Sequence, residues 1–108
     1  MKTGIQLITE ERERQISKEG WTPEHDANHV NGEIARAGAA YAYAATLKPP
    51  MRESVTGIYS FRNNEIIRGL WPWESQWWKP SDKMRDLVKA GALIAAEIDR
   101  LQRIQSNK

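Results

Sequence analysis

Residues 81–104, SDKMRDLVKAGALIAAEIDRLQRI, form the most regular part of this chain of 108 residues. Apolar and small side chains recur there at spacings of three and four, which is typical of one side of a helix. These residues are Met84, Leu87, Val88, Gly91, Ile94, Ala95, Ile98 and Leu101. Pro80 precedes the stretch, Ser81 is expected to cap it, and Asp82 falls in its first turn. We therefore expect a helix over residues 81–104.

A first helix is expected near the start of the chain, over residues 5–18. Ile8 and Ile16 fall on one helical face, and most of the remaining residues are Glu, Arg and Gln, which favour helix. Gly20 is expected to end this helix. Trp21 follows directly, and we expect its indole to anchor the chain on the core.

A second helix is expected over residues 23–46. Thr22 can cap it and Pro23 suits the first helical position. The part over residues 35–45 is mostly alanine, with Gly38 inside it. Because small side chains let a partner helix approach closely, this helix is expected to pack tightly against the third.

The least regular part covers residues 47–70 and reads as an insertion. Residues 54–61 suit a short strand, and residues 65–67 its return after a turn, although a loop or short helix is nearly as well supported. The sequence thus predicts a mainly α fold in one domain, residues 1–108. It is a small three-helix domain with an irregular or hairpin-like insertion between helices 2 and 3.

Composition excludes several classes of protein. Sixteen Lys and Arg against fourteen Asp and Glu leave a net charge of +2, and the charges are interspersed, so duplex nucleic acid is an unlikely partner. The chain has no cysteine, which excludes disulfides, thiolate metal sites and cysteine nucleophiles. No apolar run approaches a membrane span or a signal core. We therefore expect a cytoplasmic protein with no membrane partner.

Tryptophan is strongly over-represented. Four of the five tryptophans lie within the Trp-rich segment, residues 71–80. Indole faces interleaved with basic side chains suit a planar base stacked on a ring and a phosphate held beside it. The candidate ligand-binding residues are Trp21, Trp71, Trp73, Trp77, Trp78, Lys79 and Arg85. The alternative is that the indoles clamp the helices together as core anchors.

A possible metal site lies at the start of the expected second helix. On a continuous helix His25, His29 and Glu33 would form one line, with Asp26 beside them. The better supported alternative is that the acidic residues serve the helix N-terminus and the histidines are solvated or hydrogen-bonded, since no zinc-protease pattern is present. A divalent metal is therefore only a possible cofactor, and no other is expected.

Two blocks of sequence resemble a family of small, largely uncharacterised phage and prophage proteins. The first is EGWTPEHD at residues 19–26, with His29, Gly32 and Glu33. The second comprises WPW at 71–73, WWKP at 77–80 and RDLVKAGALI at 85–94. The resemblance implies a phage origin, and thus the cytoplasm of an infected host, more than it implies an activity.

A further similarity is to the RyR domain, a small helical module. It is carried by Gly20-Trp21, by Pro72-Trp73 and by the Lys/Asp/Arg-containing start of the last helix. Prokaryotic domains of this type are linked with nucleotide-like ligands, so the similarity implies a ligand of that class.

The leading hypothesis is a non-enzymatic phage protein that binds a nucleotide-type small molecule and sequesters a host defence signal. The first alternative is a protein-interaction module that inhibits a host enzyme through the Trp-rich segment. The second is a metal-dependent nucleotide hydrolase that would use His25, Asp26, His29 and Glu33. A paired-carboxylate site, as in the all-α nucleotide pyrophosphohydrolases, is disfavoured because Arg36 and Arg100 stand where the second carboxylate would be needed after Glu33 and Glu97. A homo-oligomer that completes the pocket across a symmetric dimer is a further possibility.

Overall fold

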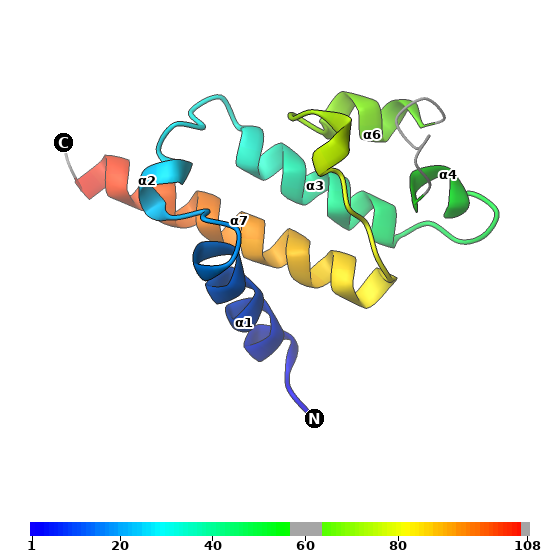
Figure 1. The fold of residues 1–108 in the computed structure, drawn as a ribbon, viewed down its shortest axis with the longest axis horizontal. Helices are drawn as coiled ribbons and strands as arrows, with labels where there is room; N and C mark the ends of the chain where they lie inside the picture. The colour runs from blue at the N-terminus through cyan, green and yellow to red at the C-terminus, as the bar shows by residue number, and fades with distance from the viewer. Residues whose placement is uncertain (57–63, 107–108) are drawn as a thin grey trace.

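The computed structural model describes residues 1–56 and 64–106, and this part of the chain is mainly helical and contains no strand. Figure 1 shows the arrangement. In chain order the elements are α1 (Gly4–Ser17), α2 (Pro23–Asp26), α3 (Glu33–Ala45), α4 (Glu53–Thr56), α6 (Glu65–Leu70), the 3-10 helix η1 (Ser75–Trp77) and α7 (Lys83–Ser106). The mainly α fold class expected from the sequence is confirmed.

Helix α7 is the longest element, and the others are arranged around it. In Figure 1 α3 runs along one side of α7, while α1 crosses its middle on the other side. Helix α6 packs on α3 on the side away from α7. None of the described helices is long and apolar enough to cross a membrane.

Helices α3 and α7 pack closely because small residues line their contact. A methyl group added at Gly38 of α3 would lie 3.2 Å from Ile94 Cγ1 and 3.3 Å from the Ala90 carbonyl oxygen. Ala90 is itself buried against α3. The tight packing of the second and third expected helices is therefore confirmed.

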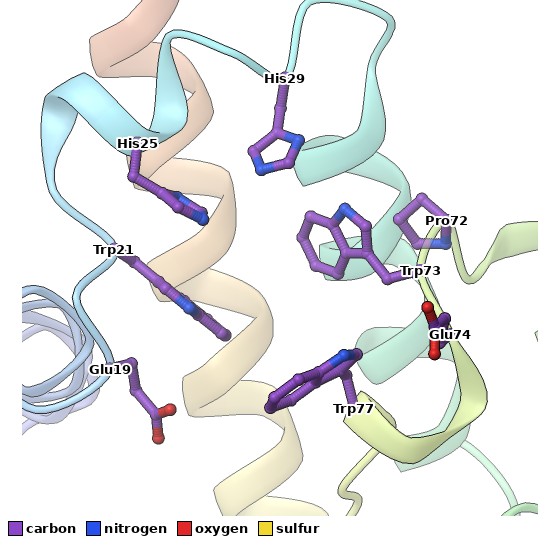
Figure 2. A pocket seen from close by; sticks show the side chains of 8 residues that line it. All are labelled: Glu19, Trp21, His25, His29, Pro72, Trp73, Glu74 and Trp77. Atoms are coloured by element: carbon purple, nitrogen blue, oxygen red, sulfur yellow. The ribbon is translucent and has the colours of Figure 1, made fainter.

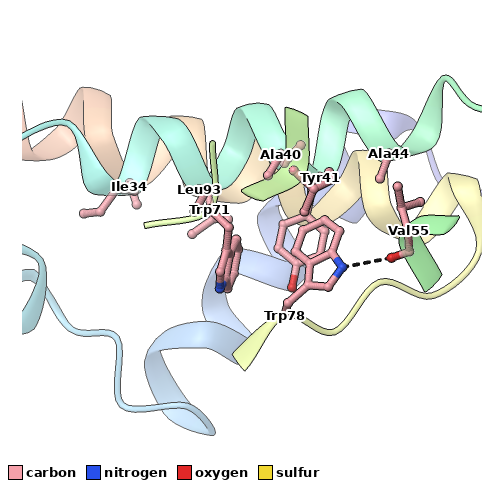
Figure 3. Packing of buried hydrophobic residues seen from close by; sticks show 12 residues of the cluster. Ile34, Ala40, Tyr41, Ala44, Val55, Trp71, Trp78 and Leu93 are labelled. Carbon is pink, nitrogen blue, oxygen red and sulfur yellow. Dashed lines mark hydrogen bonds between the residues drawn. The ribbon is translucent and has the colours of Figure 1, made fainter. Parts of the chain in front are cut away.

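The core is completed by the chain that returns from α6 (Figure 3). The Trp78 ring stacks on Tyr41 with centroids 4.6 Å apart, and its indole Nε1 donates a hydrogen bond to the Val55 carbonyl at 2.9 Å. Trp71 meets Tyr41 edge to face at 5.6 Å. Burial raises the pKa of Tyr41 to about 12. Two of the four clustered indoles, Trp71 and Trp78, are thus buried in the core.

The start of α7 is fixed by buried polar groups. The Asp86 carboxylate accepts hydrogen bonds from the Ser81 amide at 2.7 Å and from Arg52 Nη2 at 2.6 Å. The residue that caps the helix is Asp82, whose Oδ1 accepts from the Arg85 amide at 2.8 Å. The prediction that Ser81 is the cap is therefore wrong by one residue.

The expected continuous helix over residues 23–46 is also wrong. It is replaced by the single turn α2, a loop and then α3. The break ends at Gly32, which adopts a φ of +81° that residues with a side chain rarely adopt. Asn31 and Gly32 together form a turn dipeptide, and its preference overrides the apolar spacing that runs through it.

The expected hairpin is not formed by the described residues of the insertion. Residues 54–56 belong to α4 and residues 65–67 to α6. The central part of the expected hairpin, residues 57–63, lies outside the described residues.

The apolar stripe of α7 does not face the core along its length. Met84, Leu87, Ile94, Ile98 and Leu101 are each exposed by 45% or more. The buried residues of α7 are three alanines, Val88, Leu93 and three charged residues, namely Asp86, Glu97 and Arg100. Of the expected stripe, Val88 is buried and Gly91 packs against Ile8 of α1, so periodicity located this helix correctly and its buried face only in part.

Candidate functional site

A cavity of about 770 Å³ lies between two segments that are far apart in the sequence (Figure 2). One wall comes from the chain that follows α1 and the other from the Trp-rich segment, and in this view α7 runs between them. The lining residues are Glu19, Trp21, His25, His29, Pro72, Trp73, Glu74 and Trp77. The volume is in the range of small-molecule sites.

The first wall is positioned by the turn that ends α1. Gly20 has a φ of +74°, which reverses the chain and allows the Trp21 amide to donate to the Gln15 carbonyl at 2.9 Å. Thr22 then caps α2, with its Oγ1 accepting from the His25 amide at 3.2 Å. The helix start predicted at Thr22 and Pro23 is thereby confirmed, and Trp21 and His25 both line the cavity from this part of the chain.

His29 comes from the loop between α2 and α3. Its Nδ1 lies 3.4 Å from Glu33 Oε2, and the Asn31 amide donates to the same carboxylate. Burial acts to raise the pKa of Glu33, but the hydrogen bonds from the Glu33 and Asn31 amides and from His29 outweigh it, so this pKa is lowered. Glu33 thus remains charged and holds His29 at the cavity.

The second wall is held by Glu74 and η1. The Glu74 carbonyl accepts from Trp71 Nε1 at 3.1 Å and from the Trp77 amide at 3.0 Å. These two bonds tie the wall to a buried indole. Trp77 is 54% exposed and forms the rim.

The rings of the two walls meet at steep inclinations. Trp21 and Trp73 have centroids 6.4 Å apart and planes inclined by 45°. His29 meets Trp73 at 5.3 Å and 64°, and Trp71 meets Trp73 at 5.4 Å and 90°. The cavity, called the cup below, is therefore lined by rings that contact one another at different inclinations, and Trp73 joins it to the core through Trp71.

The structure places some of the predicted ligand-binding indoles in the cavity lining and the others in the core. Trp21, Trp73 and Trp77 line the cavity. Trp71 and Trp78 are only 6% and 7% exposed and belong to the core.

The two predicted basic residues lie outside the lining. Lys79 lines a smaller neighbouring cavity, with its Nζ 5.6 Å from the Trp77 ring centroid. Arg85 forms an ion pair with Glu11. Of the two predicted basic residues, Lys79 therefore does lie against a predicted indole, in the smaller cavity that Trp21 and Trp77 also line, whereas Arg85 does not.

The predicted metal ligands are not gathered into one site either. Within residues 1–56 and 64–106, no three His, Cys, Asp or Glu side chains are placed to hold a metal ion. Asp26 is buried and pairs with Arg12, while His25 Nδ1 lies 3.2 Å from the other oxygen of Asp26. His29 still lies 3.4 Å from Glu33, and the centroids of the two imidazoles are 4.9 Å apart, but the continuous helical line of ligands is not formed.

Sequence reasoning missed three of the lining residues, namely Glu19, Pro72 and Glu74. Glu19 directly precedes Gly20-Trp21, and the other two flank Trp73. Their position beside candidate indoles was the available signal. His25 and His29 were selected for metal binding, but the structure places them among the indoles.

No protein-family model, curated protein or solved structure matches this chain. The resemblances to phage proteins and to the RyR domain therefore stay predictions.

Proposed function

We propose that this chain binds a small organic molecule in the aromatic cavity between residues 19–29 and 72–77. The observation that carries the proposal is the lining itself, in which three indoles and two imidazoles surround about 770 Å³. Ligand sites are typically concave and mostly apolar, with a few polar groups that fix orientation. Glu19 and Glu74 are such polar groups.

Preformed geometry supports a binding role. The walls are fixed by backbone turns and by rings that contact the buried Trp71, so little ordering is needed when a ligand enters. Trp77, unlike the buried indoles, keeps most of its ring surface exposed after folding. Trp77 therefore offers a contact surface to a ligand.

The nucleotide class expected from the sequence is only half supported. Ring contacts to a base are available from the indoles, but the basic side chains expected to bind phosphate are outside the lining. The proposed function is accordingly ring-mediated recognition. Phage origin, a role in countering host defence, oligomerisation and a cytoplasmic location stay predictions.

The alternative of a protein-docking segment is less well supported. It expects several indoles of the Trp-rich segment to be exposed together, whereas Trp77 is the exposed one among the four. The hydrolase alternative lacks a cluster of carboxylates or histidines able to hold a metal in the described part of the chain.

Ligand titration tests the proposal. Tryptophan fluorescence and melting temperature would be followed with AMP, ADP-ribose, nicotinamide mononucleotide, choline and 3,3-dimethyl-1-butanol as probes. We expect at least one to change both signals, and Trp77→Ala to weaken its binding. Met51→Ala, which removes an exposed apolar side chain outside the lining, is the matched control. A panel without any effect on the wild-type protein would refute the proposal.

A further inference from the structure

The charge of the cavity identifies the class of ligand. Of the described side chains that line it, two are carboxylates, Glu19 and Glu74, and none is a lysine or arginine. We propose that the ligand is an organic cation with a compact N-methylated ammonium head, as in choline. This inference rests on the proposed function and adds the class of ligand to it.

Ring orientation favours such a head over a flat base. A flat ring is best held between parallel faces, but Trp21 and Trp73 are inclined by 45° and His29 and Trp73 by 64°. A compact ammonium head needs no pair of parallel faces and can lie against one indole face, such as that of Trp77, which is 54% exposed. Indole faces carry negative electrostatic potential and attract such cations.

The carboxylates strengthen the attraction. Glu74 is exposed, and none of the Lys or Arg side chains in the described residues forms an ion pair with its carboxylate. Glu19 shares its charge with Arg14, whose Nη1 lies 2.9 Å from Glu19 Oε1. A cation entering the cup therefore meets one unpaired and one partly compensated negative charge, which would repel a phosphate.

The basic groups near the cavity are already engaged. The Nδ1 atoms of His25 and His29 lie 3.2 and 3.4 Å from the carboxylates of Asp26 and Glu33. Lys79 lies over the Trp77 ring and borders the smaller neighbouring cavity. These contacts leave the acidic groups to set the charge preference of the cup.

A pair of ligands that differ only in charge tests the inference. Choline and 3,3-dimethyl-1-butanol have the same shape, but the first carries a quaternary nitrogen where the second carries a carbon. Binding is measured by fluorescence titration and by the ring-current shift of the ligand methyl protons in NMR. We expect choline to bind at least about tenfold more tightly.

The outcomes separate this inference from the proposed function. Equal affinity for the two ligands overturns the charge preference and leaves a ring-mediated site. Binding of AMP without binding of choline also overturns it and points to the nucleotide class. If none of the three binds, the cation inference is refuted, and the remaining probes of the wider panel decide the proposed function.

A charge-neutral variant provides an internal check. Glu74→Gln should weaken choline binding about threefold and leave the affinity for 3,3-dimethyl-1-butanol unchanged. Glu24→Gln removes an exposed glutamate of α2 that does not line the cavity, and it should change neither affinity. An equal effect of both variants on choline would attribute the preference to the overall charge of the protein and overturn the role of the cavity.

Discussion

Arg12 of α1 holds Asp26 at the end of α2, with Nη2 2.7 Å from Oδ2. A second nitrogen of the same guanidinium, Nη1, donates to the Trp21 carbonyl at 3.1 Å. One side chain therefore fixes both ends of the wall that carries Trp21 and His25. Asp26, which the sequence suggested as a metal ligand, has a structural role in this wall.

Replacing Arg12 should loosen that wall. Arg12→Met keeps most of the aliphatic stem but leaves the buried Asp26 carboxylate without its guanidinium partner, so we expect a loss of about 3 kcal/mol in the free energy of unfolding. Urea denaturation measures it. Arg36→Met, at an exposed position of α3, is the matched control and should stay within about 0.5 kcal/mol. Similar losses in the two variants would contradict the structural role of Arg12.

The same substitution at the adjacent residues Trp77 and Trp78 should lower stability by very different amounts. Trp78→Phe leaves the Val55 carbonyl without its indole donor, and we expect a loss of about 2 kcal/mol in stability. Trp77→Phe should cost less than about 0.5 kcal/mol, because Trp77 is more than half exposed.

Fluorescence quenching by acrylamide separates the two residues independently of stability. Removing Trp77 should delete the most readily quenched emission, whereas removing Trp78 should leave it. Equal quenching in the two variants would show that the core and rim assignments are wrong.

The sequence could predict that some of these indoles are buried in the core and others are exposed, but not which ones. Four rings within eight positions cannot all face one core, but this excess left open whether the remaining rings would line a pocket or an interface. The assignment depends on long-range partners: Trp78 meets Tyr41 and Val55, which lie 37 and 23 positions earlier in the chain. No local pattern contains that information.

Dependence on long-range partners also explains why the role of Arg85 was predicted wrongly. Glu97 pairs with Arg100, three residues further along the same helix, at 2.6 Å. Arg85 was assigned to phosphate because it follows the Trp-rich segment, yet it pairs with Glu11 of α1. Spacing within one helix predicts pairs on that helix, whereas pairs between helices depend on how the helices cross.

The helix break before α3 can be tested through two glycines. Nothing lies within 4 Å of a methyl group added at Gly32 or at Gly69, so packing does not distinguish them. Gly32→Ala should lower stability by about 1 kcal/mol because Gly32 has a φ of +81°. Gly69→Ala, within α6, should be neutral or raise it by up to about 1 kcal/mol. Stabilisation by Gly32→Ala would support the continuous helix that the sequence predicted.

Glu11 makes the stability of the fold depend on acid pH. It is 2% exposed and accepts hydrogen bonds from Arg14 at 2.8 and 2.9 Å and from Arg85. Burial acts to raise the pKa of Glu11, but the two arginines outweigh it, so this pKa is lowered in the folded protein. A lowered pKa means that the stabilisation is complete above the pKa of the unfolded chain, about 4.3, and is lost as pH falls through the folded value.

Glu11→Gln should therefore cost about 2 kcal/mol of stability at pH 7, and the difference from the wild-type protein should shrink as pH falls below about 4. Glu13→Gln, an exposed glutamate on the same helix, controls for the change in net charge. Urea denaturation from pH 7 to pH 3 measures all three proteins. A difference between wild type and Glu11→Gln that stays constant over this range would show that the ionised carboxylate is not the source of the stabilisation, because only its protonation changes with pH.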